Sequence, residues 1–155
     1  MSTFEVNGKT YTVTENIKLM TFLRDNLRLL SVKNGCSEGA CGTCSVLVDG
    51  ISKKSCALKS DNLDDTKILI VEGLSEREKN VYSYAFTNAG AVQCGFCTPG
   101  MIMSAKALID EKPDPSIEDI KEALSGNLCR CTGYIKIEEA VLAAAETMKK
   151  EAYND

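Results

Sequence analysis

The sequence predicts an α+β protein, in which a sheet-rich N-terminal half is followed by an all-helical C-terminal half. Two Asx-Gly dipeptides lie between short β-type segments, helix-start signals dominate after Ser75, and the eight cysteines divide four and four between the halves. A chain of 155 residues can bury one ordinary core or two small ones side by side. We therefore expect two domains, at residues 1–75 and 76–155, with the cysteines bracing both as disulfides or metal ligands.

The first expected element is a β-hairpin in TFEVNGKTYTV, residues 3–13. The Asn7-Gly8 pair supplies the positive φ angles of a type I′ turn, and Phe4 then shares a face with Tyr11. Apolar side chains next recur at helical spacing, which predicts a helix packed on that hairpin. They are Leu19, Met20, Leu23, Leu27 and Leu30.

A second hairpin is expected in SVLVDGISKKS, residues 45–55, with Asp49-Gly50 at its turn. Later, KILIVE at residues 67–72 has the apolar run of a buried strand. The order of hairpin, helix, hairpin and closing strand predicts a small β-grasp-like domain that ends near Gly73.

Four helices are expected in the second half. Ser75 and Glu78 form a possible capping box for the first of them, which Gly90 ends. Thr98 and Pro99 place a capping hydroxyl and then a proline at the start of the second.

The remaining two helices complete a predicted bundle. Pro115 and Ser116 give a start signal for the third, IEDIKEAL, which Gly126 can close. The fourth runs from about Tyr134 and has a predicted buried stripe of Ile137, Val141, Leu142, Ala145 and Met148.

Three N-terminal cysteines lie in a glycine-rich loop, GCSEGACGTC, and eleven residues separate the last of them from a fourth cysteine. The spacing C-x4-C-x2-C…C is the plant-type ferredoxin pattern for a [2Fe-2S] cluster. Glycines let such a loop aim backbone N–H groups at the sulfurs of an anionic cluster. Zinc and disulfides are the alternatives, but this loop lacks the two similar CxxC knuckles of a zinc ribbon. The candidate ligands are Cys36, Cys41, Cys44 and Cys56.

The C-terminal cysteines form a C-x2-C pair and a C-x-C pair, with thirty-one residues between the two pairs. Each pair directly precedes an expected helix. If the two helices lie side by side, the positive ends of both dipoles would face, and stabilise, one anionic cluster. A thioredoxin-like redox pair lacks its βαβ context here, and C-x-C spacing is unusual for the other alternative, zinc. The candidate ligands are Cys94, Cys97, Cys129 and Cys131.

Composition excludes several other classes of function. The net charge of −4, without a Lys/Arg-rich patch, argues against nucleic-acid binding. No apolar run approaches the roughly 18 residues of a membrane span, and the first residues lack the pattern of an export signal. We therefore expect a soluble, cytoplasmic protein, whose clustered cysteines bind metal or do redox chemistry. The absence of histidine removes the commonest acid–base residue.

Three segments together resemble a known family: GCSEGACGTCSV, QCGFCTPGM and NLCRCTGY. They are similar to the iron–sulfur part of the molybdenum hydroxylases, the xanthine dehydrogenase and aldehyde oxidoreductase family, over essentially the whole chain. The likeness is in particular to bacterial members that carry this part as a small subunit, beside an FAD-binding medium subunit and a molybdopterin-binding large subunit. It implies a ferredoxin-like N-terminal domain and a four-helix C-terminal domain, each holding one [2Fe-2S] cluster.

The resemblance also implies a role for individual residues. The C-terminal cluster would lie next to the molybdopterin, in its cytosine dinucleotide form, with Cys131 as the nearest ligand, and the N-terminal cluster would face the FAD. Gln93 would hydrogen-bond the pterin, because its amide offers both a donor and an acceptor. The alternative for Gln93 is a polar group at a helix boundary that is satisfied by its own backbone.

The family function implied is a relay of single electrons from molybdopterin through two clusters to FAD, while the complex hydroxylates an N-heterocycle such as nicotinate or a purine. The chain would place and tune these centres. It has no histidine base and no glycine-rich dinucleotide motif, so we expect no catalytic residue on it. A free-standing two-cluster ferredoxin carrier and a zinc-stabilised adaptor are the alternatives.

Overall fold

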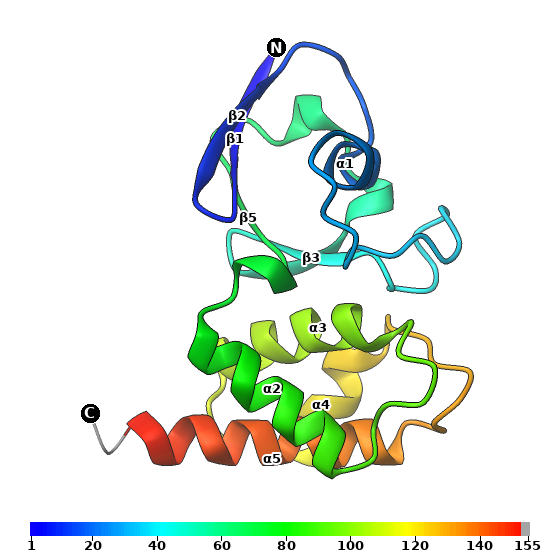
Figure 1. Ribbon diagram of the computed structural model, residues 1–155, viewed down its shortest axis with the longest axis vertical. Helices are drawn as coiled ribbons and strands as arrows, with labels where there is room; N and C mark the ends of the chain where they lie inside the picture. The colour runs from blue at the N-terminus through cyan, green and yellow to red at the C-terminus, as the bar shows by residue number, and fades with distance from the viewer. Residues whose placement is uncertain (153–155) are drawn as a thin grey trace.

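The computed structural model describes residues 1–152 and divides into a sheet half and a helical half (Figure 1). In Figure 1 the strands lie above and helices α2 to α5 below, with β3 and α3 facing one another where the halves meet. The predicted α+β class, a β-grasp sheet followed by four helices, is confirmed.

Five strands form one mixed sheet in the order β2-β1-β5-β3-β4. β1 and β5 are parallel, and the other neighbours are antiparallel. The last strand is shorter than predicted, because the chain turns into a 3-10 helix at Val71–Gly73. The strands are β1 Ser2–Val6, β2 Lys9–Val13, β3 Ser45–Val48, β4 Ile51–Lys54 and β5 Lys67–Leu69.

Both hairpin turns have the predicted backbone. Asn7 and Gly8 have φ angles of 49° and 82°, and the Asp49-Gly50 turn has 50° and 82°. Positive φ at both central residues defines the type I′ turn that Asn-Gly and Asp-Gly favour. Phe4 pairs with Tyr11 across β1 and β2, so the predicted register is confirmed.

The helical segment after the first hairpin is shorter than the leucine spacing predicts. α1, Leu19–Thr21, continues as a π-helical turn over Phe22–Asn26 and stops there. Arg28 then takes a left-handed φ of 58°, and the Arg24 guanidinium donates to the Val32 carbonyl at 2.6 Å, which fixes the chain after the turn. The predicted extension to Leu30 is therefore wrong, and that side chain is 50% exposed.

The four predicted helices are present, and two of them begin at capping boxes. Ser75 and Glu78 form one, and Ser116 and Asp119 form the other, with the side chain of each partner bonded to the backbone N–H of its counterpart. The helices are α2 Glu76–Asn88, α3 Thr98–Glu111, α4 Ile117–Leu124 and α5 Ile135–Ala152.

Thr98 is not the cap of α3, contrary to the prediction. Cys97 occupies the N-cap position, because the turn closed by the Thr98 N–H and the Gly95 carbonyl, at 3.3 Å, brings Thr98 into the helix. The Thr98 hydroxyl is buried and has no hydrogen-bond partner among residues 1–152.

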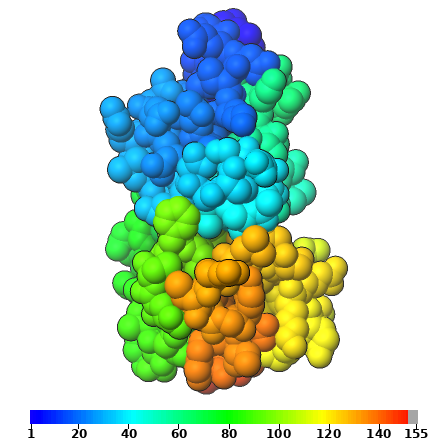
Figure 2. All heavy atoms as spheres, turned by 90° about the vertical axis from the view of Figure 1, so that its right-hand side faces the viewer, coloured from blue at the N-terminus to red at the C-terminus, as the bar shows by residue number. Residues whose placement is uncertain are grey.

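Two hydrophobic clusters fill the two halves. In β3, Val46 and Val48 belong to the cluster under α1, whereas Leu47 belongs to the cluster of the helices. Successive strand residues point to opposite faces of a sheet, so the cluster that contains α1 lies on one face of β3 and α3 packs against the other. The exact boundary between residues 75 and 76 stays a prediction. Figure 2 shows how closely the halves meet, with the segments near residues 40, 95 and 130 in contact on one face.

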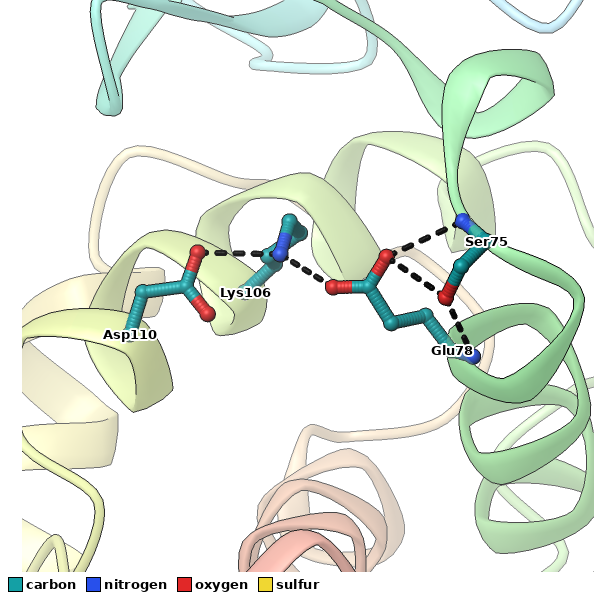
Figure 3. Close-up of polar contacts among 4 residues, drawn as sticks. All are labelled: Ser75, Glu78, Lys106 and Asp110. Atoms are coloured by element: carbon teal, nitrogen blue, oxygen red, sulfur yellow. Dashed lines mark hydrogen bonds and ion pairs between the residues drawn. The ribbon is translucent and has the colours of Figure 1, made fainter.

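A buried ion pair fixes the start of α2 against α3 (Figure 3). Lys106, 7% exposed, binds Glu78 and lies 2.9 Å from Asp110 Oδ2. Although burial opposes the charged form, hydrogen bonds to Glu78 and Asp110 raise the pKa of Lys106. Since Glu78 also accepts from the Ser75 N–H at 3.0 Å, one carboxylate serves both the capping box and the ion pair.

Within residues 1–152, none of the helices combines the length and apolar character of a transmembrane span.

The shortened α1 segment generates a stability prediction. Leu23 is fully buried, so Leu23→Ala should reduce the free energy of unfolding by about 2–5 kcal/mol through the cavity it leaves. Leu30→Ala is the matched control, expected within about 0.5 kcal/mol of the parent because the side chain is half exposed. Anaerobic urea unfolding followed by circular dichroism measures both, and equal losses would show that the leucine stripe does extend to residue 30.

Candidate metal centres

The N-terminal cysteines are brought together by the second hairpin and the loop before it. Cys44 directly precedes β3, and Cys56 lies in the 3-10 helix Ser55–Ala57 that directly follows β4. β3 and β4 are antiparallel with Ser45 opposite Lys54, so the two cysteines lie at the same end of the hairpin. Cys36 and Cys41 reach this end from the glycine-rich loop.

These four thiols are arranged as two pairs. Cys36 lies within hydrogen-bond reach of Cys41, and Cys56 lies within reach of Cys44. The backbone N–H groups of Cys41, Glu38 and Ala40 all donate to Cys36 Sγ at 3.4 Å. These three donors lower the pKa of the Cys36 thiol to about 6, which favours the thiolate that binds metal.

The second pair is buried. Burial, followed by the neighbouring Cys44 thiol, raises the pKa of Cys56, while the Gly39 N–H donates to Cys56 Sγ at 3.2 Å and opposes the rise. A thiol that is buried against other thiols gains little from ionising alone. It becomes a stable thiolate when a metal ion supplies the compensating positive charge.

The C-terminal cysteines lie at the starts of α3 and α5. The helices are not packed along one another as the dipole argument supposed: α3 packs against β3 and α4, whereas α5 packs against α2 and α4. Both starts nevertheless line one cavity of about 390 Å³, and both helices begin on the right of Figure 1. The cavity is lined by Gly35, Cys41, Thr43, Cys94, Phe96, Cys97, Leu128, Cys129, Arg130, Cys131 and Tyr134.

This set also forms two pairs of thiols. The sulfurs of Cys94 and Cys131 are 3.6 Å apart, and Cys97 lies within hydrogen-bond reach of Cys129. Burial, followed by the Cys129 thiol, raises the pKa of Cys97 to about 12. Burial opposes ionisation of Cys129 as well, but hydrogen bonds from the Thr132 hydroxyl at 3.1 Å and the Thr132 N–H at 3.5 Å lower its pKa.

The paired arrangement matches the ligand pattern of a binuclear cluster. Among residues 1–152, no three His, Cys, Asp or Glu side chains converge tightly enough to hold one metal ion. A zinc ion requires four ligands around one point, each about 2.3 Å away for sulfur. A [2Fe-2S] cluster instead takes two cysteines on each of two irons. Both sets, with their paired thiols and N–H or hydroxyl donors to sulfur, meet that requirement.

A direct backbone contact joins the two sites. The Leu128 N–H donates to the Cys41 carbonyl at 2.8 Å, and Leu128 is followed by Cys129. Asn127 lies beside this bond and is 5% exposed. Its amide donates to the Gly42 carbonyl at 3.1 Å and accepts from the Ser104 hydroxyl at 2.8 Å. One asparagine therefore fastens the first cysteine loop to the second.

Two glycines permit this close approach. A Cβ on Gly42 would lie 2.3 Å from the Gly126 carbonyl oxygen, and a Cβ on Gly100 would lie 2.5 Å from the Gly42 carbonyl oxygen. Backbone atoms cannot move away as the end of a flexible side chain can, so neither position accepts a larger residue without displacing a cysteine loop.

One pair of the second site faces outward. Cys94 and Cys131 are exposed, whereas Cys97 is buried. Gln93 is exposed too, and its amide has no hydrogen-bond partner among the described residues. The structure therefore lacks the alternative arrangement, in which the Gln93 side chain would bond to its own backbone. The same region carries exposed apolar side chains, Val92, Phe96, Leu128 and Ile135.

Several residues that shape these sites escaped the sequence analysis. Thr132 donates to a cysteine sulfur, and the Tyr134 hydroxyl accepts from the Cys129 N–H at 3.0 Å. Both lie within the NLCRCTGY segment, so their nearness to the cysteines was a usable signal. Asn127 begins the same segment, but its role could not be predicted from that position, because its partner Gly42 is 85 residues away in the chain.

The junction generates a prediction at Gly42. Gly42 and Gly50 have positive φ angles of 75° and 82°, but a Cβ on Gly50 would meet nothing within 4 Å. Gly50→Ala should therefore cost only the left-handed penalty, about 1–2 kcal/mol of unfolding free energy. Gly42→Ala should cost about 1–3 kcal/mol more because of the clash. Urea unfolding of both variants measures the difference, and equal losses would contradict the tight junction.

Comparison with known proteins agrees with this geometry. The model of the 2Fe-2S iron-sulfur cluster binding domain matches residues 1–82, and that of the [2Fe-2S] binding domain matches residues 70–142. The chain is 52% identical over 136 residues to the nicotinate dehydrogenase small FeS subunit of Eubacterium barkeri, covering 86% of this chain and 87% of that protein.

Two solved structures have the same fold. Quinoline 2-oxidoreductase from Pseudomonas putida 86 contains a chain with 38% identity and a TM-score of 0.86, matched over 96% of this chain and 95% of that one. The aldehyde oxidoreductase from Desulfovibrio gigas matches with 38% identity and a TM-score of 0.89, over 97% of this chain but 17% of that longer one. The chain therefore belongs to the family of small [2Fe-2S] subunits that transfer electrons in molybdenum hydroxylases.

Proposed function

We propose that this chain holds two [2Fe-2S] clusters and relays single electrons from a molybdopterin-binding large subunit to an FAD-binding medium subunit. The N-terminal unit, residues 1–75, would bind one cluster and residues 76–155 the other. The observation that carries the proposal is the division of eight thiols into four pairs, two at each site. Each cluster, when bound, would accept and release one electron at a time. The ligands are Cys36, Cys41, Cys44, Cys56, Cys94, Cys97, Cys129 and Cys131.

The residues of the chain would hold and tune the two clusters. Backbone N–H groups around Cys36 and the Thr132 hydroxyl at Cys129 offer hydrogen bonds to sulfur. Such donors stabilise negative charge on a cluster and so favour its reduced form. The hydrogen bond between the Cys41 carbonyl and the Leu128 N–H links a ligand of one cluster to the residue before a ligand of the other. The two clusters would therefore have a short, fixed connection through the backbone.

The exposed side of the C-terminal site supports its orientation toward the large subunit. Cys131 and Gln93 are both exposed there, and the unpartnered amide of Gln93 is available to a pterin edge. We propose that the partner holds molybdopterin in its cytosine dinucleotide form, and that the N-terminal site faces the FAD. The neighbouring exposed apolar side chains would be covered in the complex.

The names of the relatives support an N-heterocyclic substrate for the complex, such as nicotinate or a purine. One relative is a nicotinate dehydrogenase subunit, and one structural match is a quinoline 2-oxidoreductase. The relative is itself named as a subunit, which favours a subunit over a free-standing carrier. We propose no catalytic residue on this chain and place the complex in the cytoplasm.

The two-cluster proposal is tested by removing one buried ligand at each site. Cys56→Ala and Cys97→Ala should each lower the iron content after anaerobic reconstitution from about four to about two per chain, since a [2Fe-2S] cluster holds two irons. Electron paramagnetic resonance of the dithionite-reduced parent should show two signals. Each variant should lose a different one, so that each is the control for the other. Loss of the same signal from both variants would contradict two independent sites.

The orientation is tested with two isoleucines of similar exposure. Ile135 begins α5 next to the C-terminal site and is 65% exposed, whereas Ile51 is 62% exposed at the start of β4. Ile135→Asp should weaken association with the co-expressed large subunit about tenfold or more, because a charge enters an apolar contact. Ile51→Asp should leave that association unchanged. Titration of the purified subunits measures the affinity. Equal losses of affinity in the two variants would contradict the orientation.

A further inference from the structure

Lys54 places a positive charge beside the N-terminal cysteine site. It is the last residue of β4 and is half-buried. The ion pairs found within residues 1–152 do not include it. Its Nζ instead donates to the carbonyl oxygen of Gly39 at 2.6 Å and to that of Ala40 at 3.4 Å.

The two peptide groups that Lys54 contacts are the ones that face Cys36. The Gly39 carbonyl and the Ala40 N–H belong to one planar peptide group, and the Ala40 carbonyl and the Cys41 N–H belong to the next. Both N–H groups donate to Cys36 Sγ at 3.4 Å. Each peptide group therefore has an ammonium at its oxygen and a cysteine sulfur at its N–H.

Hydrogen bonds arranged in such a chain polarise one another. An ammonium that donates to the carbonyl oxygen draws electron density of the peptide group toward that oxygen. The N–H of the same peptide group then becomes a stronger donor to sulfur. The ammonium also fixes the orientation of both peptide groups. Gly126 of the helical half lies beside this arrangement, since a Cβ there would be in ordinary van der Waals contact, at 3.5 Å, with Lys54 Cε and Nζ.

We propose that Lys54 is a positioning residue that raises the reduction potential of the N-terminal cluster through these two peptide groups. The inference rests on the proposed function, because it requires a [2Fe-2S] cluster on the N-terminal cysteines. The step is a one-electron reduction of a diferric cluster to the mixed-valence form. No bond forms or breaks, and the electron comes from the partner's molybdenum centre or, in the experiment, from dithionite. The reduced cluster carries one more negative charge, which stronger N–H donors and a nearby cation stabilise.

Lys53 provides the matched control. It precedes Lys54 in β4, is exposed, and points to the opposite face because side chains alternate along a strand. Lys53→Met removes the same charge from nearly the same place without touching the loop. The C-terminal cluster of the same molecule is an internal reference.

The experiment is a redox titration of the purified, cluster-loaded protein followed by electron paramagnetic resonance. The N-terminal signal is identified as the one that Cys56→Ala removes. Lys54→Met should lower the reduction equilibrium constant of that cluster about tenfold, which is about 59 mV for one electron. The reduction potential of the C-terminal cluster should be unchanged in Lys54→Met. Lys53→Met should change the potential of neither cluster. Lys54→Arg, which keeps the charge and the donors, should stay within about threefold of the parent.

A second readout is the coupling of peptide nitrogens to the reduced cluster, measured by pulsed electron paramagnetic resonance. Lys54→Met should weaken it and Lys53→Met should not. Lys54→Gln is the second neutral variant if Lys54→Met loses iron. Loss of the N-terminal cluster from both would overturn the inference, because Lys54 would then hold the loop rather than tune the cluster.

The remaining outcomes separate the inference from the proposed function. If Lys54→Met keeps the N-terminal signal and its reduction potential is unchanged, the inference alone is overturned. An equal shift in Lys53→Met would also overturn it, because the effect would then be that of overall charge. Absence of any N-terminal signal in the parent protein would overturn the two-cluster proposal, and this inference with it.

Discussion

The contact between the two cysteine loops constrains the rest of the structure. The Leu128 N–H meets the Cys41 carbonyl, and the buried Asn127 amide binds the Gly42 carbonyl next to it. This contact requires bare backbone at Gly42 and Gly100, and it requires α3 to lie flat on β3. The helical half is thereby held in one position on the sheet half. The proposed relay between two clusters would depend on a constant separation, and a junction of backbone contacts and one buried amide provides it.

The two sites stabilise negative charge by different means. At the N-terminal site, three backbone N–H groups converge on Cys36, while the Cys44 and Cys56 pair is buried beneath them. At the C-terminal site, the Thr132 hydroxyl and N–H serve Cys129, and another pair of sulfurs is exposed. In the proposed relay, a cluster with exposed ligands would suit contact with a partner's cofactor, whereas a cluster beside a loop of N–H donors would be tuned by its own protein.

Local signals in the sequence predicted the hairpin turns and most helix starts, whereas hydrogen bonds that leave no recognisable signal in the sequence account for the failures. Asn7-Gly8 fixed its turn and Ser75 with Glu78 fixed a helix start, because each depends on residues at most three positions apart. Leu30 and Thr98 were misplaced because Arg24 and the turn at Gly95 redirect the chain there. Cysteine spacing predicted both groups of thiols, which the structure brings together. It could not reveal Asn127 or Lys54, whose partners come from a different element of the fold.

We infer from the pairing of its thiols that this chain holds binuclear iron. Mössbauer spectroscopy of the protein loaded with ⁵⁷Fe under anaerobic conditions tests it most directly, because it reports the environment of every iron. We expect all iron of the oxidised protein to be in diamagnetic diferric pairs, divided equally between two environments. Iron in mononuclear sites or [4Fe-4S] clusters, or a single kind of pair accounting for half the expected iron, would contradict it.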